Sequence, residues 1–246
     1  MELIINHLKI LRMKRLVLSI IAVIAVSALM GQSLEEIVKK HSAAMKSDDL
    51  AKINTARITG KVAQMGMEMP LIMTMKRPDK VRVSTSMNGM EIIQVFDGAK
   101  GYMLNPFSGS TEMVEIPAEQ AKQIEKNNMF VNQLARSLDE GGLELIGEQE
   151  VDGQKTFKIK VSIEGVDDAF YFISKETYLP VMTSITMEAM GQKMDVEIYT
   201  MEFTNFNGMF LPKRTVTYSG GMEVASMIYE KVEVNIPIDD SLFTKK

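Results

Sequence analysis

The fold is decided by residues 70–98, which read PLIMTMKRPDKVRVSTSMNGMEIIQVFDG. Apolar and polar side chains alternate along this stretch, and a period of two is typical of β-strands with one buried face. Arg77-Pro78-Asp79 and Asn88-Gly89 interrupt the alternation, and Asp97-Gly98 ends it. Asn-Gly and Asp-Gly favour tight hairpin turns because they tolerate a positive φ. The stretch therefore predicts an antiparallel meander.

Further alternating runs follow in the second half of the chain. They are Leu143–Val151, Lys155–Ile163, Phe170–Ser174, Leu179–Met190, Lys193–Phe203, Phe210–Tyr218 and Met222–Val234. Together with the strands expected between residues 52 and 105, they predict about eleven strands. Asp152-Gly153 and Asn207-Gly208 mark two of the turns between them.

Two helices are predicted beside these strands. Ser33-Leu34-Glu35-Glu36 is a capping box, and we expect its helix to run past His41 and Met45 and to end near residues 47–49. The second helix is expected from Pro117 to Gly141. Since no strand-helix-strand rhythm occurs, we predict a mainly β (α+β) fold. It would be an incomplete antiparallel β-barrel whose helices form a lid or plug over an apolar cavity.

The apolar run Leu16–Met30 follows Met13-Lys14-Arg15 and is closed by Gly31-Gln32-Ser33. It is shorter than the ~20 residues of a membrane-spanning helix, so it is interpreted as a secretory signal peptide. We expect residues 1–31 to be an upstream extension plus this leader, and residues 32–246 to be a single domain.

The compartment follows from the leader and from the composition. Cleavage beside Val26-Ser27-Ala28 and cleavage after Gly31 both stay open. The chain has no cysteine, which excludes disulfides and a lipid-modified N-terminal cysteine. We therefore expect a periplasmic protein without a lipid anchor. The formal net charge of −4 argues against nucleic acid as a partner.

Sequence motifs of catalysis are missing. His41 is the one histidine after the predicted leader, and no His-Glu-x-x-His or Gly-x-Ser-x-Gly motif occurs. The acidic pairs Asp167-Asp168 and Asp239-Asp240 are interpreted as solvated loop residues. The glycines show no phosphate-binding spacing. We predict a protein that is not an enzyme and has no cofactor or metal site.

The chain has 22 methionines and no tryptophan. Met73, Met75 and Arg77 share one face of a predicted strand by their spacing of two. Such methionines either form ordinary core or line a cavity for apolar ligands. Arg77 either reaches solvent from the strand end or holds a partner inside. If the face is a cavity wall, that wall comprises Met73, Met75, Val81, Val83, Met87 and Val95.

Residues 73–78, 95–98 and 105–107 resemble, in order and spacing, the LolA family of periplasmic carriers of outer-membrane lipoproteins. Residues 150–153, 206–212 and 238–243 also look like LolA-like proteins. The resemblance implies a cavity that shelters acyl chains of lipoproteins or a similar lipid. It also implies an inner-membrane lipoprotein-releasing transporter as donor and an outer-membrane acceptor. Arg77 matches the family arginine that hydrogen-bonds the lid from inside.

Two other functions compete with a carrier. One is a periplasmic lipid- or lipoprotein-sensing regulator of the RseB-like type, which uses a related fold. The other is an enzyme acting on lipids, for which the sequence supplies no nucleophile with a base.

Overall fold

A computed structural model gives the structure of residues 32–64, 66–162, 168–189 and 192–245. The predicted signal peptide, residues 1–31, lies outside the described residues. Contacts between Cα atoms divide the chain into two units, residues 1–37 and 38–246, and the whole sheet belongs to the second. Among the described residues, no helix is long and apolar enough to cross a membrane.

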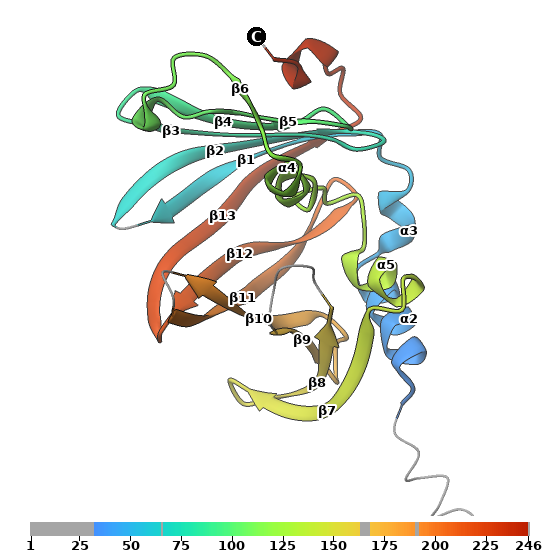
Figure 1. Ribbon diagram of the computed structural model, residues 1–246. Helices are drawn as coiled ribbons and strands as arrows, with labels where there is room; N and C mark the ends of the chain where they lie inside the picture. Colours follow the sequence, from blue (N-terminus) through green and yellow to red (C-terminus); the bar gives the residue numbers. More distant parts are fainter. Residues whose placement is uncertain (1–31, 65, 163–167, 190–191, 246) are drawn as a thin grey trace, which may run out of the picture. The chain divides into compact units, whose positions relative to one another are not determined.

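Thirteen strands within the described residues form one antiparallel sheet, with β6 and β7 at its edges (Figure 1). Their order is β6-β5-β4-β3-β2-β1-β13-β12-β11-β10-β9-β8-β7. The strands are β1 Thr55–Gln64, β2 Met67–Lys76, β3 Lys80–Met87, β4 Met90–Phe96, β5 Gly101–Leu104, β6 Val114–Ile116, β7 Leu143–Val151, β8 Gln154–Val161, β9 Asp168–Ser174, β10 Pro180–Ala189, β11 Gln192–Phe206, β12 Met209–Ser219 and β13 Met222–Val234. The sheet is curved and open, which confirms the predicted incomplete barrel.

The helices are few and short. In the described part of the chain they are α2 Leu34–Ala44, α3 Ser47–Leu50, η1 Pro106–Ser108, α4 Ala118–Glu125, α5 Gln133–Asp139 and η2 Asp240–Phe243. The Ser33 hydroxyl accepts from the Glu36 amide at 3.2 Å, as a capping box requires. α2 ends earlier than predicted because Lys46 adopts a left-handed φ of 52°, after which α3 starts.

The strand count exceeds the predicted eleven by two. β6, with three residues, is too brief to show alternation in a sequence, whereas β5 lies within residues 52–105, where strands were expected. They form because β4 offers unpaired backbone groups to β5, and β5 offers them to β6.

The predicted turn at Asn88-Gly89 is confirmed and sets the register of β3 against β4. Both residues have a positive φ, 52° and 77°, which a two-residue hairpin of this kind needs. Met87 therefore pairs with Met90, Val81 with Phe96, and Arg82 with Val95.

The single helix predicted between Pro117 and Gly141 is wrong, because residues 126–132 separate α4 from α5. Asparagine side chains in this segment bind backbone groups that a continuous helix would use itself. The Asn128 carbonyl oxygen accepts from the Phe130 amide at 3.0 Å, and that of Asn132 caps α5 by accepting from the Ala135 amide at 3.1 Å.

α4 packs inside the curve of the sheet, against β3, β4 and β5 (Figure 1). The approach is close at Gly101, where an added Cβ would lie 2.6 Å from the Cβ of Ala121. Ala121 and Ile124 of α4 join Met75, Val81 and other residues of β1–β4 in one buried cluster. Two small residues therefore let a helix fill this part of the sheet's inner face.

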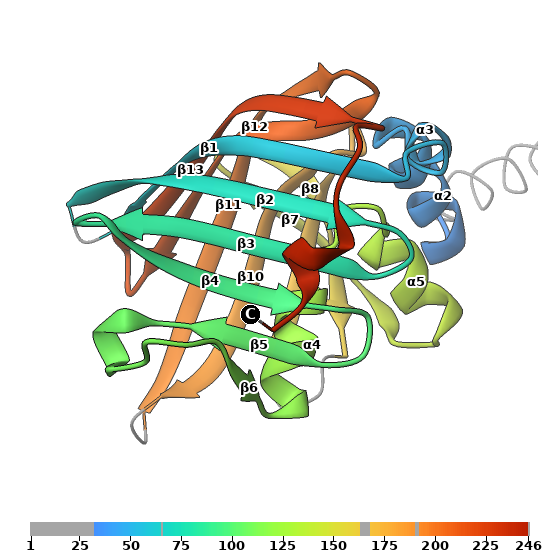
Figure 2. The same ribbon diagram turned by 90° about the horizontal axis from the view of Figure 1, so that it is seen from above.

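The C-terminal segment crosses the outer face of β1–β4 (Figure 2). Asp240 accepts from Lys76 and Lys80 at 3.1 and 2.8 Å, and Arg82 donates to the carbonyl oxygen of Leu242 at 3.1 Å. The side chain of Phe243 is completely buried there. The C-terminal segment thus covers part of the outer face of this half of the sheet.

Candidate functional site

Arg77 follows β2 and binds the helical segments. Its Nε donates to the carbonyl oxygen of Ile53 at 2.8 Å, and its Nη2 donates to that of Leu50 at 2.9 Å. Its guanidinium also lies 5.0 Å from the ring centroid of Phe130, in the segment between α4 and α5. One side chain therefore joins the end of β2 to the end of α3 and to the α4–α5 connection.

Five of the six residues predicted as cavity wall share one face of β2 and β3. Register places Met73 opposite Val83 and Met75 opposite Val81, and spacing of two extends this face to Met87. Met73, Met75 and Val81 are buried in the cluster that includes α4, and Val83 packs against it. Met87 is half-buried. In this structure the predicted wall is core, and its contact with acyl chains stays a prediction that requires α4 to move away.

Val95 does not belong to this wall, which corrects the prediction. Its neighbour in register is Arg82, so it points to the outer face of the sheet. There it is completely buried in a cluster with Ile238 and Phe243 of the C-terminal segment.

An apolar cavity lies beside the Arg77 contacts. It has a volume of ≈ 140 Å³ and is lined mostly by apolar surface. Leu50, whose carbonyl binds Arg77, is part of the lining. The complete lining is His41, Met45, Ser47, Leu50, Met129, Val131, Asn132, Gln133, Leu134, Tyr171, Pro180, Phe210 and Leu211.

Hydrogen bonds of Asn132 hold three helices together at this cavity. Its side-chain amide donates to the hydroxyls of Ser42 on α2 and Ser47 on α3, at 3.1 and 3.0 Å, while its carbonyl oxygen caps α5. The lining of this cavity therefore combines helices and strand residues that lie far apart in the sequence.

His41 is a buried polar group of this lining. Its Nδ1 lies 2.9 Å from the carbonyl oxygen of Tyr178, and because a carbonyl can only accept, Nδ1 carries the hydrogen. Burial lowers the pKa of the imidazole, and the hydrogen bond to Tyr178 opposes this with a smaller effect. The lowered pKa favours the neutral imidazole, and His41 acts here as a structural hydrogen-bond donor.

Sequence reasoning missed the cavity itself, although it found part of its lining. His41 and Met45 belong to the first predicted helix, and Val131 and Leu134 lie within the range predicted for the second. Tyr171, Phe210 and Leu211 come from strands distant in the sequence, and no local pattern joins them to these helices. In the described part of the chain, no three His, Cys, Asp or Glu side chains are grouped to hold a metal ion.

Comparison with known proteins identifies the architecture. No family model and no curated protein sequence matches the chain. A LolA superfamily protein from Nitrosomonas europaea has a similar structure, with a TM-score of 0.55 and 12% identity over 83% of this chain and 97% of that one. The chain has a LolA-like fold.

Two further structures support the LolA-like assignment. A domain from Vibrio parahaemolyticus described as an outer membrane lipoprotein-sorting protein domain gives a TM-score of 0.57, with 10% identity over 85% of this chain and 95% of that one. A DUF1329 family protein from Desulfovibrio piger gives 0.51, with 11% identity over 85% and 97%. At these identities the likeness shows the LolA-like fold alone.

Proposed function

We propose that this protein is a periplasmic carrier that shelters the acyl chains of lipoproteins, or of a similar lipid, and delivers them to the outer membrane. The observation that carries the proposal is the apolar cavity between the helices and the strand ends, next to the Arg77 contacts. Uptake and release of an acyl chain need only differences in affinity, so we propose a binding protein and not an enzyme.

We propose that this structure represents the closed state of the carrier, because its apolar cavity is small. Its ≈ 140 Å³ is close to the volume of a cavity that binds a molecule as small as benzene. A complete acyl chain needs more room, and the nearest apolar surface is the buried face of Met73, Met75 and Val81 under α4. Loading would therefore displace α4 and residues 126–132, and Arg77 would oppose that movement through its two carbonyl partners and Phe130.

A pair of single-tryptophan variants tests the binding of acyl chains at this site. Because the chain has no tryptophan, each introduced indole is the sole one. Phe210→Trp places it in the cavity lining, and Phe107→Trp places it on η1, where the native side chain is 45% exposed. A brominated fatty acid should quench Phe210→Trp at low micromolar concentration and leave Phe107→Trp bright. Equal quenching of both, or none, would reject the site.

Delivery is tested with lipoprotein as cargo. Native mass spectrometry of protein recovered from the periplasm should show a bound acylated polypeptide, since that is the cargo we propose. The loaded protein should then pass its cargo to outer-membrane vesicles. Bound free lipid without transfer of lipoprotein would contradict a lipoprotein carrier and favour a lipid shuttle or sensor.

A further inference from the structure

A groove lies between α4 and the inner face of β4–β6, and we call it the α4 groove. It has a volume of ≈ 320 Å³. Within the described residues, it has no lining residue in common with the apolar cavity. Four of its lining side chains end in a carboxamide, and the other three are apolar. The lining comprises Gln94, Met103, Ile116, Gln120, Gln123, Ile124 and Asn127.

The four carboxamides face the groove from both of its walls. Gln94 projects from the inner face of β4, because its partner in register on β3 is Val83. Gln120 and Gln123 are one turn apart on α4, and Asn127 continues the same side just beyond the helix. In the described part of the chain, no hydrogen bond joins any of these four side chains to another protein group. Their donors and acceptors are therefore available to a ligand.

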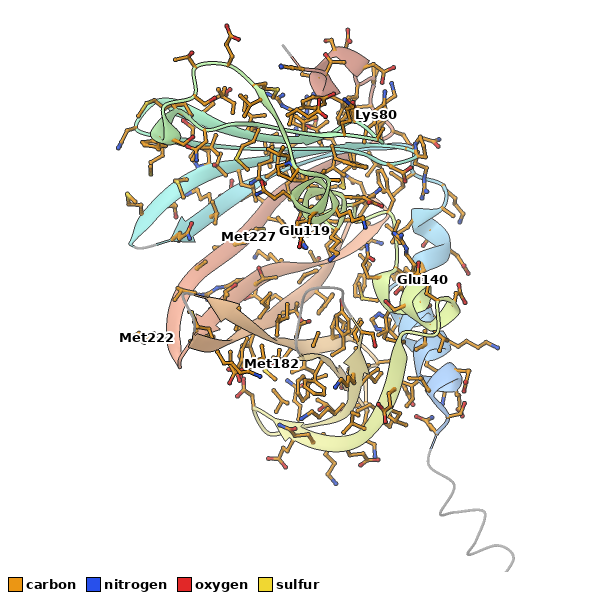
Figure 3. The ribbon with its side chains drawn as sticks, in the orientation of Figure 1. Lys80, Glu119, Glu140, Met182, Met222 and Met227 are labelled. Atoms are coloured by element: carbon orange, nitrogen blue, oxygen red, sulfur yellow. The ribbon has the colours of Figure 1, made fainter. Side chains whose placement is uncertain are left out.

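The charged side chains of α4 are placed elsewhere. Lys122, Glu125 and Lys126 line another cavity, of ≈ 430 Å³, which extends to Tyr171 of β9. Glu119, at the start of α4 in Figure 3, is exposed and lines neither space. The described lining of the α4 groove thus carries no formal charge.

This lining discriminates between classes of ligand. A phosphate, a carboxylate or an ammonium group would lose hydration in the groove and find no opposite charge there. The described lining also lacks an aromatic ring on which a sugar could stack. A carboxamide offers N–H donors and a carbonyl acceptor, which match the groups of a peptide bond. Met103 adapts to apolar side chains of varied shape.

We propose that the α4 groove binds an uncharged peptide segment of a partner protein. The carboxamides of Gln94, Gln120 and Gln123 would hydrogen-bond to the backbone of the segment. Met103 and Ile116 would contact its apolar side chains.

Occupation of the groove would oppose acyl loading, and this step rests on the proposed function. Ile124 lines the groove and also belongs to the buried cluster with Met75 and Val81, so the shape of the groove depends on α4 lying on the sheet. Acyl loading would displace α4, so the peptide segment would bind the empty protein more tightly than the loaded one. A partner that fills the groove would thereby promote release of the cargo.

The test is a titration of the isotope-labelled, lipid-free protein with the blocked peptide acetyl-Leu-Asn-Val-Ser-Leu-amide, followed by NMR. The side-chain amide signals of Gln94, Gln120 and Gln123 should shift and saturate. The signal of Gln154, which is exposed on β8 outside the groove, should not move. A peptide with aspartate in place of asparagine has the same shape and an added charge, so it should bind about tenfold more weakly.

A double variant tests the carboxamides themselves. Gln94→Leu with Gln123→Leu keeps similar side-chain volumes and removes two amides, so it should weaken peptide binding about tenfold. Binding of a neutral fluorescent acyl probe should stay within about twofold. Gln64→Leu with Gln154→Leu is the matched control, because both amides are exposed on strands and line neither the groove nor the two cavities. The comparison of the two peptides with the unaltered protein stands even where the double variant fails to fold.

The coupling is measured with both ligands present. A saturating concentration of the acyl probe should weaken peptide binding, and the peptide should weaken binding of the probe by the same factor. Independent binding of the two ligands would overturn the proposed opposition between them.

The outcomes separate the groove from the proposed function. Absence of saturable shifts, equal binding of both peptides, or full binding by Gln94→Leu with Gln123→Leu would overturn the inference. Shifts that maltose produces at lower concentration than the peptide would also overturn it and favour a sugar ligand. Binding of the peptide without any binding of the acyl probe would overturn the proposed function and the coupling, and would support the peptide site alone.

Discussion

Both halves of the sheet have an apolar inner face, but the helices lie on the two faces differently. On β2 and β3 the inner face is filled, because Met75 and Val81 are completely buried in the cluster that includes Ala121 and Ile124 of α4. Beside β9, in the other half of the sheet, the helices leave two cavities that meet at Tyr171. An apolar inner face is therefore core or cavity wall according to how closely a helix lies on it.

Small residues account for much of the difference. Gly101 and Ala121 bring α4 against β5 so closely that an added Cβ would lie 2.9 Å from the Cα of Ala121. On the other half, the partly buried Tyr171 projects from β9 between the two cavities.

Met75→Glu tests whether the inner face of β2 is closed to solvent. A carboxylate buried there without a cationic partner should lower the free energy of unfolding by about 3–5 kcal/mol. Met67→Glu, at a side chain 44% exposed on the same strand, should change it by less than about 0.5 kcal/mol. Urea denaturation measures both. Equal losses would show that Met75 is not in a closed core.

Arg77→Leu tests the connection between this face and the helices. Loss of the bonds to Leu50 and Ile53 should cost about 1.5–3 kcal/mol. Hydrogen exchange should increase in residues 47–53 and 126–132. We expect the variant to load cargo and to release it slowly to an outer-membrane acceptor. The reason is that it lacks the two hydrogen bonds by which Arg77 stabilises the empty, closed protein.

Arg77→Lys is the control for that experiment. The lysine keeps the positive charge and can reach one of the two carbonyl oxygens. The rate at which Arg77→Lys releases cargo should therefore lie between the rates of the unaltered protein and of Arg77→Leu. Transfer by Arg77→Leu at the original rate would show that the side chain has no part in opening.

Gly101→Ala tests the close approach of α4. The added methyl group meets Ala121 and Ile116, neither of which can yield easily, so we expect a loss of about 1–3 kcal/mol in unfolding free energy. Acyl-probe binding should increase if α4 is pushed from the β2–β4 face. Gly142→Ala is the matched control, because its added Cβ would find no atom closer than 3.5 Å. Unchanged stability and binding in Gly101→Ala would refute the proposed role of this contact.

His41→Asn tests the half of the sheet that borders the apolar cavity, and its effect on stability should be the smallest of the four. The folded protein holds the pKa of His41 below its ordinary value of 6.5, so the unfolded chain takes up the proton first on acidification. The contribution of His41 to stability is thus complete above about pH 6.5 and falls as the pH decreases below it.

The asparagine amide can replace the Nδ1 donor to Tyr178 and does not titrate. The fall in melting temperature between pH 7 and pH 5 should therefore be smaller in His41→Asn. If the melting temperature falls equally in His41→Asn and in the unaltered protein, groups other than His41 cause the pH dependence.

Local sequence patterns sufficed for the longer strands and several turns. Leu143–Val151 and Met222–Val234 were predicted with their observed bounds, because alternation depends on the strand's own side chains. The spacing of two along a strand also places Arg77 on the same face as Met75. The outward position of Val95 also follows from local rules, since a two-residue turn at Asn88-Gly89 pairs Val81 with Phe96 and leaves Val95 opposite Arg82.

Long-range packing decided the rest. Alternation fixes which side chains share a face, yet it does not say whether a helix will cover that face. Only the folded chain brings Leu50, Val131 and Phe210 around one cavity. Likewise, only the contacts around Asn128 and Asn132 divide the second helix into two. The sequence thus determined the longer strands, while the shortest strand and the cavities depend on contacts between residues far apart along the chain, whose geometry no local pattern encodes.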